Sequence, residues 1–167
     1  MKCNSKRYFF VFLLFFSCTS NQKENLPEPF LIINDAFVSA PFRNEISISD
    51  ILAKNSFEHQ SVNVFISNKH NKELTDTLKT IEDSNNRFVI LKTKGKEVLE
   101  KAVIKTNNIK LKNNIKVGIK KDFFIKAFNT ERWPNTYVIT NTEQTSEIVF
   151  YFNESTLDSI LYLGYVD

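Results

Sequence analysis

The chain has 167 residues, of which 42% are hydrophobic and 13% are aromatic, and its formal net charge is +3. A chain of this length can bury a core large enough to fold without disulfides. Its three glycines are too few to build a glycine-rich phosphate loop.

Residues 1–17 have the features of a signal peptide. Lys2, Lys6 and Arg7 come before nine consecutive apolar residues, 8–16. A transmembrane helix needs about 20 apolar residues. The run is therefore too short to span a bilayer, and it fits the apolar part of a signal peptide.

The small residue Ser17 stands immediately before Cys18, and this pair resembles the lipobox of bacterial lipoproteins. In that family the signal peptidase cuts before the cysteine, and the thiol carries diacylglycerol. The resemblance implies that a lipid on Cys18 anchors the protein to a membrane. An ordinary secretory signal, cut nearby, is the alternative.

Removal of the signal peptide changes the charge of the chain. Three cationic side chains and no acidic ones precede Cys18, so nineteen Lys and Arg remain against nineteen Asp and Glu. A neutral mature chain gives no reason to expect nucleic-acid binding. With Cys3 removed and Cys18 acylated, no thiol remains for a disulfide, a metal site or a catalytic nucleophile.

Residues 18–29 are polar and carry Pro27 and Pro29, so we expect a tether between the lipid and the folded part. The sequence QKE at 22–24 faintly resembles the surface-export signals of some Gram-negative lipoproteins. We therefore expect an outer-membrane lipoprotein of the cell envelope. The sequence leaves open whether it faces the periplasm or the cell surface.

The first half of the folded part alternates short strand signals with one helix signal. We expect a helix of one or two turns within 46–57, where Ser47 or Ser49 can act as the N-cap. Strands are expected at these segments: 30–33, 61–67, 76–81, 87–93 and 97–106. The apolar spacing within 74–81 and 98–103 also fits a helix, and that alternative stays open.

The second half reads as a strand, a helix and three further strands. Alternating Ile109 and Leu111 suggest a strand within 108–118. A helix over 119–128 is expected to turn one face to the core, formed by Ile119, Phe123, Phe124, Ala127 and Phe128. Its other face would then carry Lys120, Lys121, Asp122 and Lys126. Strands are expected at 136–140, 147–152 and 157–166, with a short polar hairpin loop at 153–156.

The last three strand segments of the first half, 76–81, 87–93 and 97–106, line up with the three of the second half, 136–140, 147–152 and 157–166. The loops between them are of similar length in the two halves. We therefore predict an α+β fold, built as a tandem repeat of a short helix packed on an antiparallel sheet of three to four strands. The first unit would cover residues 30–110 and the second 111–167.

Two tandem units of this kind behind a lipoprotein signal resemble the beta-lactamase-inhibitor-protein-like superfamily, which includes small outer-membrane lipoproteins of the BamE/SmpA type. The resemblance rests on the helix opening IKVGIKKDFFIKAFN at 115–129 and on Pro134 soon after it. Lys120 departs from the usual capping Ser or Thr, and Asn129 from the usual Gly. That superfamily binds proteins through variable loops and sheet faces, so the resemblance implies a protein-binding role and carries over no functional residue.

The residue types needed for catalysis are not grouped in any recognisable pattern. The sequence has no G-x-S-x-G, S-x-x-K or paired-carboxylate signature. His59 and His70 lie in polar segments and would need a third ligand to hold a metal. We therefore expect no cofactor, no metal site and no enzymatic activity. An envelope hydrolase or small-ligand-binding enzyme with an unrecognised site is the alternative.

Two features are candidates for contact with a partner, which we expect to be another envelope protein. Eleven lysines against three acids lie between Lys92 and Lys126; Lys110, Lys112 and Lys120 belong to this stretch. Such a basic region could bind an acidic partner or lipid head groups, or it could simply discourage strand aggregation. Arg132 and Trp133 are typical interface residues, although a lone Trp can also cover a core.

Overall fold

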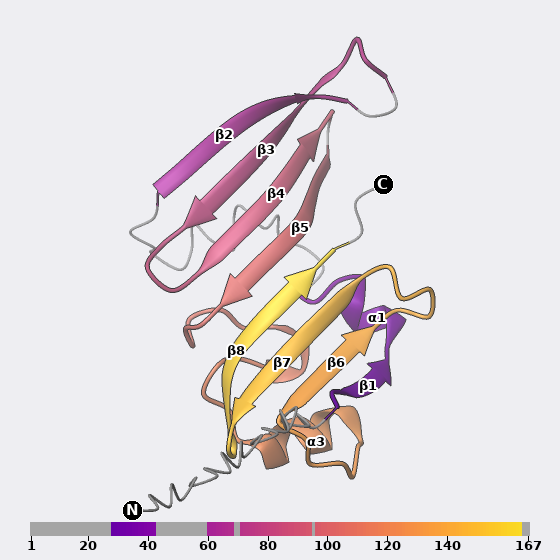
Figure 1. Ribbon diagram of the computed structural model, residues 1–167, viewed down its shortest axis with the longest axis vertical. Coiled ribbons are helices and arrows are strands. Elements are labelled where there is room, and N and C mark those ends of the chain that lie inside the picture. The colour runs from indigo at the N-terminus through magenta and orange to yellow at the C-terminus, as the bar shows by residue number, and fades with distance from the viewer. Residues whose placement is uncertain (1–27, 43–59, 69–70, 95, 165–167) are drawn as a thin grey trace, which may run out of the picture.

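The computed structural model describes residues 28–42, 60–68, 71–94 and 96–164. Within them, a single mixed sheet forms one layer and two short helices lie against it (Figure 1). The strands are β1 (Phe30–Ile33), β2 (Gln60–Ser67), β3 (Thr75–Glu82), β4 (Arg87–Thr93), β5 (Lys96–Ile104), β6 (Thr136–Thr140), β7 (Glu147–Asn153) and β8 (Thr156–Leu163). The helices are α1 (Asp35–Val38), the single 3₁₀ turn η1 (Lys112–Asn114) and α3 (Lys121–Phe128).

The strands lie in the order β1-β6-β7-β8-β5-β4-β3-β2. Two antiparallel meanders, β3–β4–β5 and β6–β7–β8, meet through antiparallel pairing of β5 with β8, and β1 adds a parallel strand beside β6. This is an α+β fold with a mostly antiparallel sheet, as predicted. The sheet is larger than expected, because the smaller sheets predicted for the two halves are joined into one of eight strands. The helix predicted within 46–57 falls in a segment that the structure does not describe, so the repeated helix-and-sheet unit stays a prediction.

The strand predictions at 30–33, 61–67, 76–81, 87–93, 136–140 and 147–152 are confirmed. The strands predicted at 97–106 and 157–166 are also present, but they end at Ile104 and Leu163. Segments 76–81 and 97–106 were open between strand and helix, and both are strands. In each, two strand neighbours supply backbone partners along most of the segment.

The strand predicted within 108–118 is wrong. Ile109 and Leu111 are buried as the alternation suggested, but the segment lies in a loop with one 3₁₀ turn. Its backbone bonds to other loops, with Lys112 N donating to Pro41 O at 2.7 Å. Asn113 and Asn114 have φ of 55° and 59°, a left-handed conformation that ends extended structure. Both edges of β5, the preceding strand, are already paired, so no free strand edge is available beside it.

The helix predicted over 119–128 is present as α3, but its inward face is partly wrong. Phe123 was expected in the core and is 44% exposed, whereas Lys121 was expected in solvent and is only 1% exposed. The helix begins at Lys121, because Lys120 is extended and forms a bridge with Thr156. Phe124 and Lys121, three residues apart, therefore share the buried face. Asn129 ends the helix in the left-handed conformation where the resembled family has Gly.

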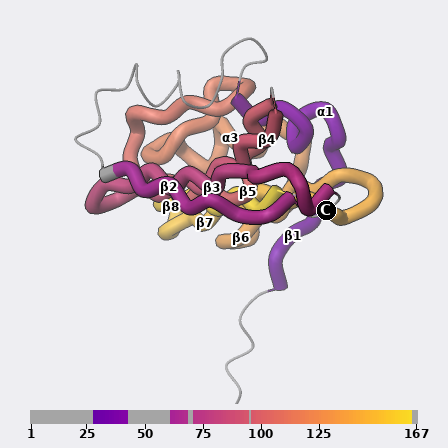
Figure 2. The backbone as a smooth tube through the Cα atoms, turned by 90° about the horizontal axis from the view of Figure 1, so that it is seen from above, coloured from indigo at the N-terminus to yellow at the C-terminus, as the bar shows by residue number. Residues whose placement is uncertain are grey.

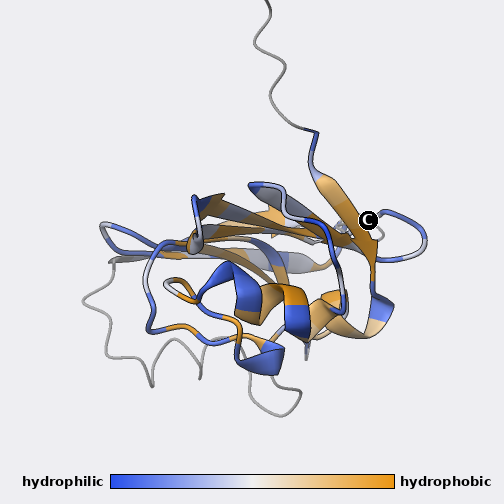
Figure 3. Ribbon diagram, turned by 90° about the horizontal axis from the view of Figure 1, so that it is seen from below, coloured by the Kyte–Doolittle hydropathy of each residue, from blue (hydrophilic) through white to orange (hydrophobic). Residues whose placement is uncertain are grey.

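An aromatic cluster of the core lies between the helices and the sheet strands β6 and β7. Both helices lie on the same side of the sheet (Figures 2 and 3). Six aromatic rings pack there at centroid distances between 4.7 and 6.3 Å: Phe37, Phe124, Phe128, Tyr137, Phe150 and Phe152. This cluster fixes α3, and with it the loop that follows the helix.

None of the helices in the described ranges is long and apolar enough to cross a membrane. The proposed signal peptide, Cys18 and most of the tether precede residue 28, where the description begins.

Candidate interaction site

The loop between α3 and β6 presents an exposed tryptophan from a well-anchored backbone. Trp133 is 56% exposed. At the start of the loop, Thr130 N donates to Ile125 O at 3.1 Å. The hydroxyl of Tyr137 donates to Arg132 O at 2.7 Å, directly before the tryptophan. Phe152 N donates to Asn135 O at 2.8 Å, which ties the far end of the loop to β7.

Lys121 lies on the core side of this loop and contacts it. Its Nζ donates to Asn135 Oδ1 at 3.0 Å. The same nitrogen is 5.6 Å from the centroid of the Trp133 ring and 5.3 Å from that of Phe152. Both distances fall within the range of cation–π attraction. Burial lowers the pKa of the Lys121 amine, because the charged form loses water there.

This arrangement makes Trp133 a preorganised aromatic. Hydrogen bonds from Tyr137 and to Asn135 hold the chain on both sides of it, and the Lys121 amine lies over its ring. An exposed aromatic held in one place loses little conformational entropy when a partner covers it. The alternative that this tryptophan covers the core does not fit its exposure, since more than half of its surface faces solvent.

Tyr137 supplies a pH-dependent test of how firmly this loop is held. Burial raises the pKa of its hydroxyl from about 10 to about 12. Both the folded and unfolded protein hold the phenol proton below pH 10, but only the unfolded protein releases it between pH 10 and 12. The free energy of unfolding should therefore fall over this interval, by on the order of 2 kcal/mol.

The Tyr137→Phe variant should lack that decrease, although it loses about 1 kcal/mol at pH 7 with the hydrogen bond to Arg132. Urea unfolding at a series of pH values from 8 to 12 measures both proteins. The free energies of unfolding of the two proteins should converge above pH 10 and cross before pH 12. Parallel curves across the whole interval would contradict the assignment to Tyr137.

The three lysines singled out in the sequence have different local surroundings. Lys112 Nζ donates to Ala36 O at 3.0 Å, beside α1, and Lys120 Nζ donates to Thr156 Oγ1 at 3.3 Å. Lys110 is exposed in the loop after β5. Further along the same stretch, Lys92 pairs with Glu97 at 2.5 Å. The lysine-rich stretch is thus spread over several elements, and some of its charges serve local contacts.

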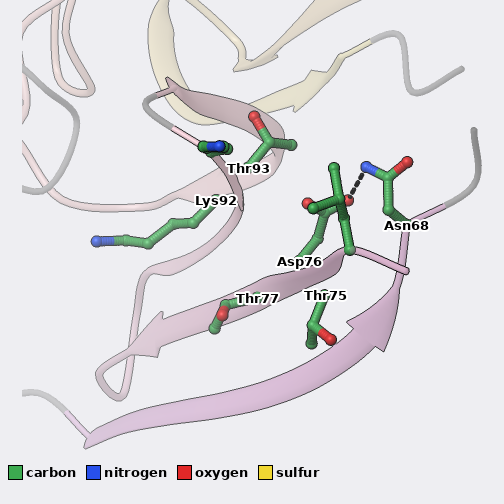
Figure 4. Close-up of a pocket in the computed structure, with 8 residues that line it drawn as sticks. Asn68, Thr75, Asp76, Thr77, Lys92 and Thr93 are labelled. Atoms are coloured by element: carbon green, nitrogen blue, oxygen red, sulfur yellow. Dashed lines mark hydrogen bonds between the residues drawn. The ribbon is translucent and has the colours of Figure 1, made fainter. Parts of the chain in front are cut away.

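A hollow of about 520 Å³ opens at the end of the β2–β3 hairpin, and the sequence did not indicate it (Figure 4). Its most buried polar group is Asp76, which accepts a hydrogen bond from Asn68 Nδ2 at 2.7 Å. Asn68 also accepts from Asn71 N at 2.8 Å, and its own N donates to Leu74 O. These bonds build the hairpin turn, so the polar groups of the hollow already have a structural role.

The sequence singles out Arg132 and Trp133 as candidates but does not indicate the groups that position them. The apolar spacing puts Lys121 on the solvent face, and no pattern points to Asn135. The signal that could have found them is the spacing: Lys121 is three residues before Phe124, so an inward Phe124 requires a partly inward Lys121. His59, His70 and Cys18 are not among the residues described. Within those that are, no group of three His, Cys, Asp or Glu is arranged to hold a metal ion.

Comparisons with protein-family models, with curated proteins and with solved structures found no match to this chain.

Proposed function

We propose that this protein is a lipid-anchored lipoprotein of the cell envelope that acts as a non-enzymatic protein-interaction module, with Trp133 at the centre of its binding site. The observation that carries the binding site is the exposed Trp133 ring on a loop anchored by Lys121, Tyr137 and Asn135. The sequence Ser17-Cys18 after a short apolar run supports the lipid anchor.

Tryptophan and arginine are the residue types that most often dominate binding energy at protein interfaces. Here they are adjacent, and both are exposed. The Trp133 side chain offers a large apolar area together with one N–H donor. The partner that fits is therefore a protein with an apolar pocket that can enclose an indole ring. The repeat of helix and sheet, and the superfamily it resembles, are part of this proposal, because that superfamily also binds proteins.

The proposed site predicts a large effect of Trp133→Ala on partner capture. A photo-crosslinking amino acid at position 132, in the lipidated chain in its native envelope, should trap the bound partner as one discrete adduct. With Trp133→Ala the adduct should fall by about 30-fold, as expected for the loss of about 2 kcal/mol at an interface hot spot. Irradiation in 1 M salt should give as much adduct from the parent chain as irradiation at low salt, since an apolar contact is not screened.

Phe123→Ala is the matched control for this experiment. Phe123 is also an exposed aromatic, at 44%, but it lies on α3 and makes no part of the loop. Its removal should leave the adduct unchanged. An adduct that survives Trp133→Ala, or that Phe123→Ala removes equally, would place the partner elsewhere.

The lipid anchor has its own test, which does not depend on the binding site. Metabolic labelling with an alkyne fatty acid should mark the parent chain and not the Cys18→Ala variant. Cys3→Ala is the control, because the other cysteine of the chain would leave with the signal peptide and its loss should not change labelling. Equal labelling of the parent and Cys18→Ala, or none of either, would reject lipidation at Cys18.

A further inference from the structure

Strand β2 is an open edge of the sheet. It pairs with β3 along its whole length, and it is the last strand in the order of the sheet. The backbone N–H and C=O groups of every second residue therefore point away from β3, and no strand of the described chain forms hydrogen bonds with them. The side chains of residues 61–65 are all exposed, including Val62 at 54%, Val64 at 50% and Phe65 at 75%.

The residues of β2 itself carry none of the sequence features by which strands usually prevent edge pairing. Natural edges are often very short, or carry lysine, proline or inward charges. Strand β2 is eight residues long, and its sequence QSVNVFIS contains no charge and no proline. The other edge, β1, has only four residues and follows Pro29. Of the two edges, β2 is the one whose residues favour addition of another strand.

We propose that β2 pairs antiparallel with β2 of a second copy of this chain, with Val64 facing Val64 across a two-fold axis. A two-fold axis perpendicular to the sheet keeps the same face of both copies on the same side, so paired residues must share a face. The Val64-centred register pairs seven residues of each strand, from Ser61 with Ser67 to Ser67 with Ser61. Centring on Phe65 shortens the overlap to residues 63–67, whereas centring on Asn63 keeps seven pairs but sets Asn63 opposite Asn63 and Gln60 opposite Ile66.

The Val64-centred register also matches residue types across the junction. On one face it sets Val62 opposite Ile66 and Val64 opposite Val64, so that only aliphatic side chains meet. Aliphatic pairs directly opposite one another stabilise antiparallel strands. Within one copy, Val64 is already paired with Leu78. The dimer would therefore continue one apolar row from Leu78 through both Val64 side chains to Leu78 of the second copy.

The other face of the junction is compatible with the same pairing. There, Phe65 lies opposite Asn63, and each Phe65 ring can cover polar neighbours of the other strand across the diagonal. Since neither strand carries a charge, two copies can approach without like-charge repulsion along the edge. A self-complementary, uncharged strand fits a second copy of itself better than it fits a charged partner segment.

The pairing leaves the Trp133 loop free. That loop joins α3 to β6, and β6 is separated from β2 by five strands of the sheet (Figure 1). The two features lie at opposite ends of the molecule. The proposed dimer is thus independent of the function proposed above, and it would present two Trp133 loops pointing away from the junction.

A cysteine scan of β2 tests the pairing. In the full chain carrying Cys3→Ser and Cys18→Ser, no cysteine remains, and single cysteines are placed at 62, 63, 64, 65 or 66. Phe123→Cys, at an exposed site on α3, is the control. Mild oxidation in detergent is followed by non-reducing electrophoresis. Only a residue at the two-fold axis faces its own copy, where the Cα atoms would be about 4.5–5.5 Å apart, within the range of a disulfide.

The expected result is a maximum of covalent dimer at position 64, at least tenfold above that of Phe123→Cys and lower on both sides. A flat profile, a maximum elsewhere on the strand, or a level no higher than the Phe123→Cys control would overturn the proposal. As a second measurement, Val64→Lys should raise the dimer dissociation constant at least tenfold in analytical ultracentrifugation, because two lysines would then face each other. Phe123→Lys should leave it unchanged, and an equal effect of both would also overturn the pairing.

Discussion

Phe124→Ala should lower the free energy of unfolding by about 3–5 kcal/mol, the range found when a large buried aromatic is truncated. Phe124 is fully buried at the centre of the aromatic cluster. Its ring lies 4.7 Å from Phe128, 4.8 Å from Tyr137, 4.9 Å from Phe150 and 5.3 Å from Phe152, measured between centroids. Truncation removes all four contacts and leaves a cavity that these rigid rings cannot fill.

The neighbouring residue provides a matched control. Phe123 is the same residue type in the same helix, but 44% of it is exposed. Phe123→Ala should cost less than about 1 kcal/mol, because little packed surface is lost. Urea unfolding followed by far-ultraviolet circular dichroism measures both variants. Equal losses of unfolding free energy in the two variants would mean that Phe123 and Phe124 both face the core, as the apolar spacing of the sequence predicts.

The same cluster links stability to the proposed binding site. Phe152 and Tyr137 both contact Phe124. Phe152 also lies near the Lys121 amine, and Tyr137 donates a hydrogen bond to Arg132 O in the loop of Trp133. Loosening the cluster should therefore also loosen the support under Trp133. At temperatures where Phe124→Ala remains folded, its Trp133 fluorescence should be closer to that of a fully hydrated indole than in the parent chain.

The strands could be predicted from the sequence because their patterns are local. Alternation of apolar and polar residues in 61–67, and β-branched or aromatic residues in 87–93 and 136–140, are properties of each segment alone. Joining the two halves into one sheet depends instead on pairing of β5 with β8, more than fifty residues apart in the chain. Nothing in either strand's pattern specifies that partner, so the single large sheet was not foreseen.

The inward face of α3 could be predicted only in part, because the apolar spacing fixes a helix but not its first residue. Lys121 N bonds to Ser155 O in the β7–β8 hairpin loop, and Lys120 is extended. These tertiary contacts start the helix at Lys121 and bring this lysine inward. The Trp133 loop was located because Trp and Pro134 are conspicuous in sequence. Its support by Asn135 depends on the turn that returns the chain to the sheet, which sequence spacing does not describe.

Asn86→Ala should lower the free energy of unfolding by about 2–3 kcal/mol, since it would leave buried hydrogen-bonding groups without partners. Asn86 is buried in the turn between β3 and β4. Its Oδ1 accepts from Lys105 N at 3.0 Å, and its Nδ2 donates to Thr106 Oγ1 at 3.1 Å and to Asp83 Oδ2 at 2.9 Å. One side chain thus joins this turn to the segment that follows β5.

Asn85→Ala is the control for this substitution. Asn85 occupies the same turn, but it is exposed, and its side chain donates to Ser84 Oγ at 3.0 Å. Its loss should change the unfolding free energy by less than about 0.5 kcal/mol. Hydrogen exchange adds a local measurement, because the Lys105 amide should exchange faster in Asn86→Ala than in Asn85→Ala. If Lys105 stays equally protected in both, Asn86 does not join the turn to β5, and the order of the β3–β4–β5 meander must come from strand pairing alone.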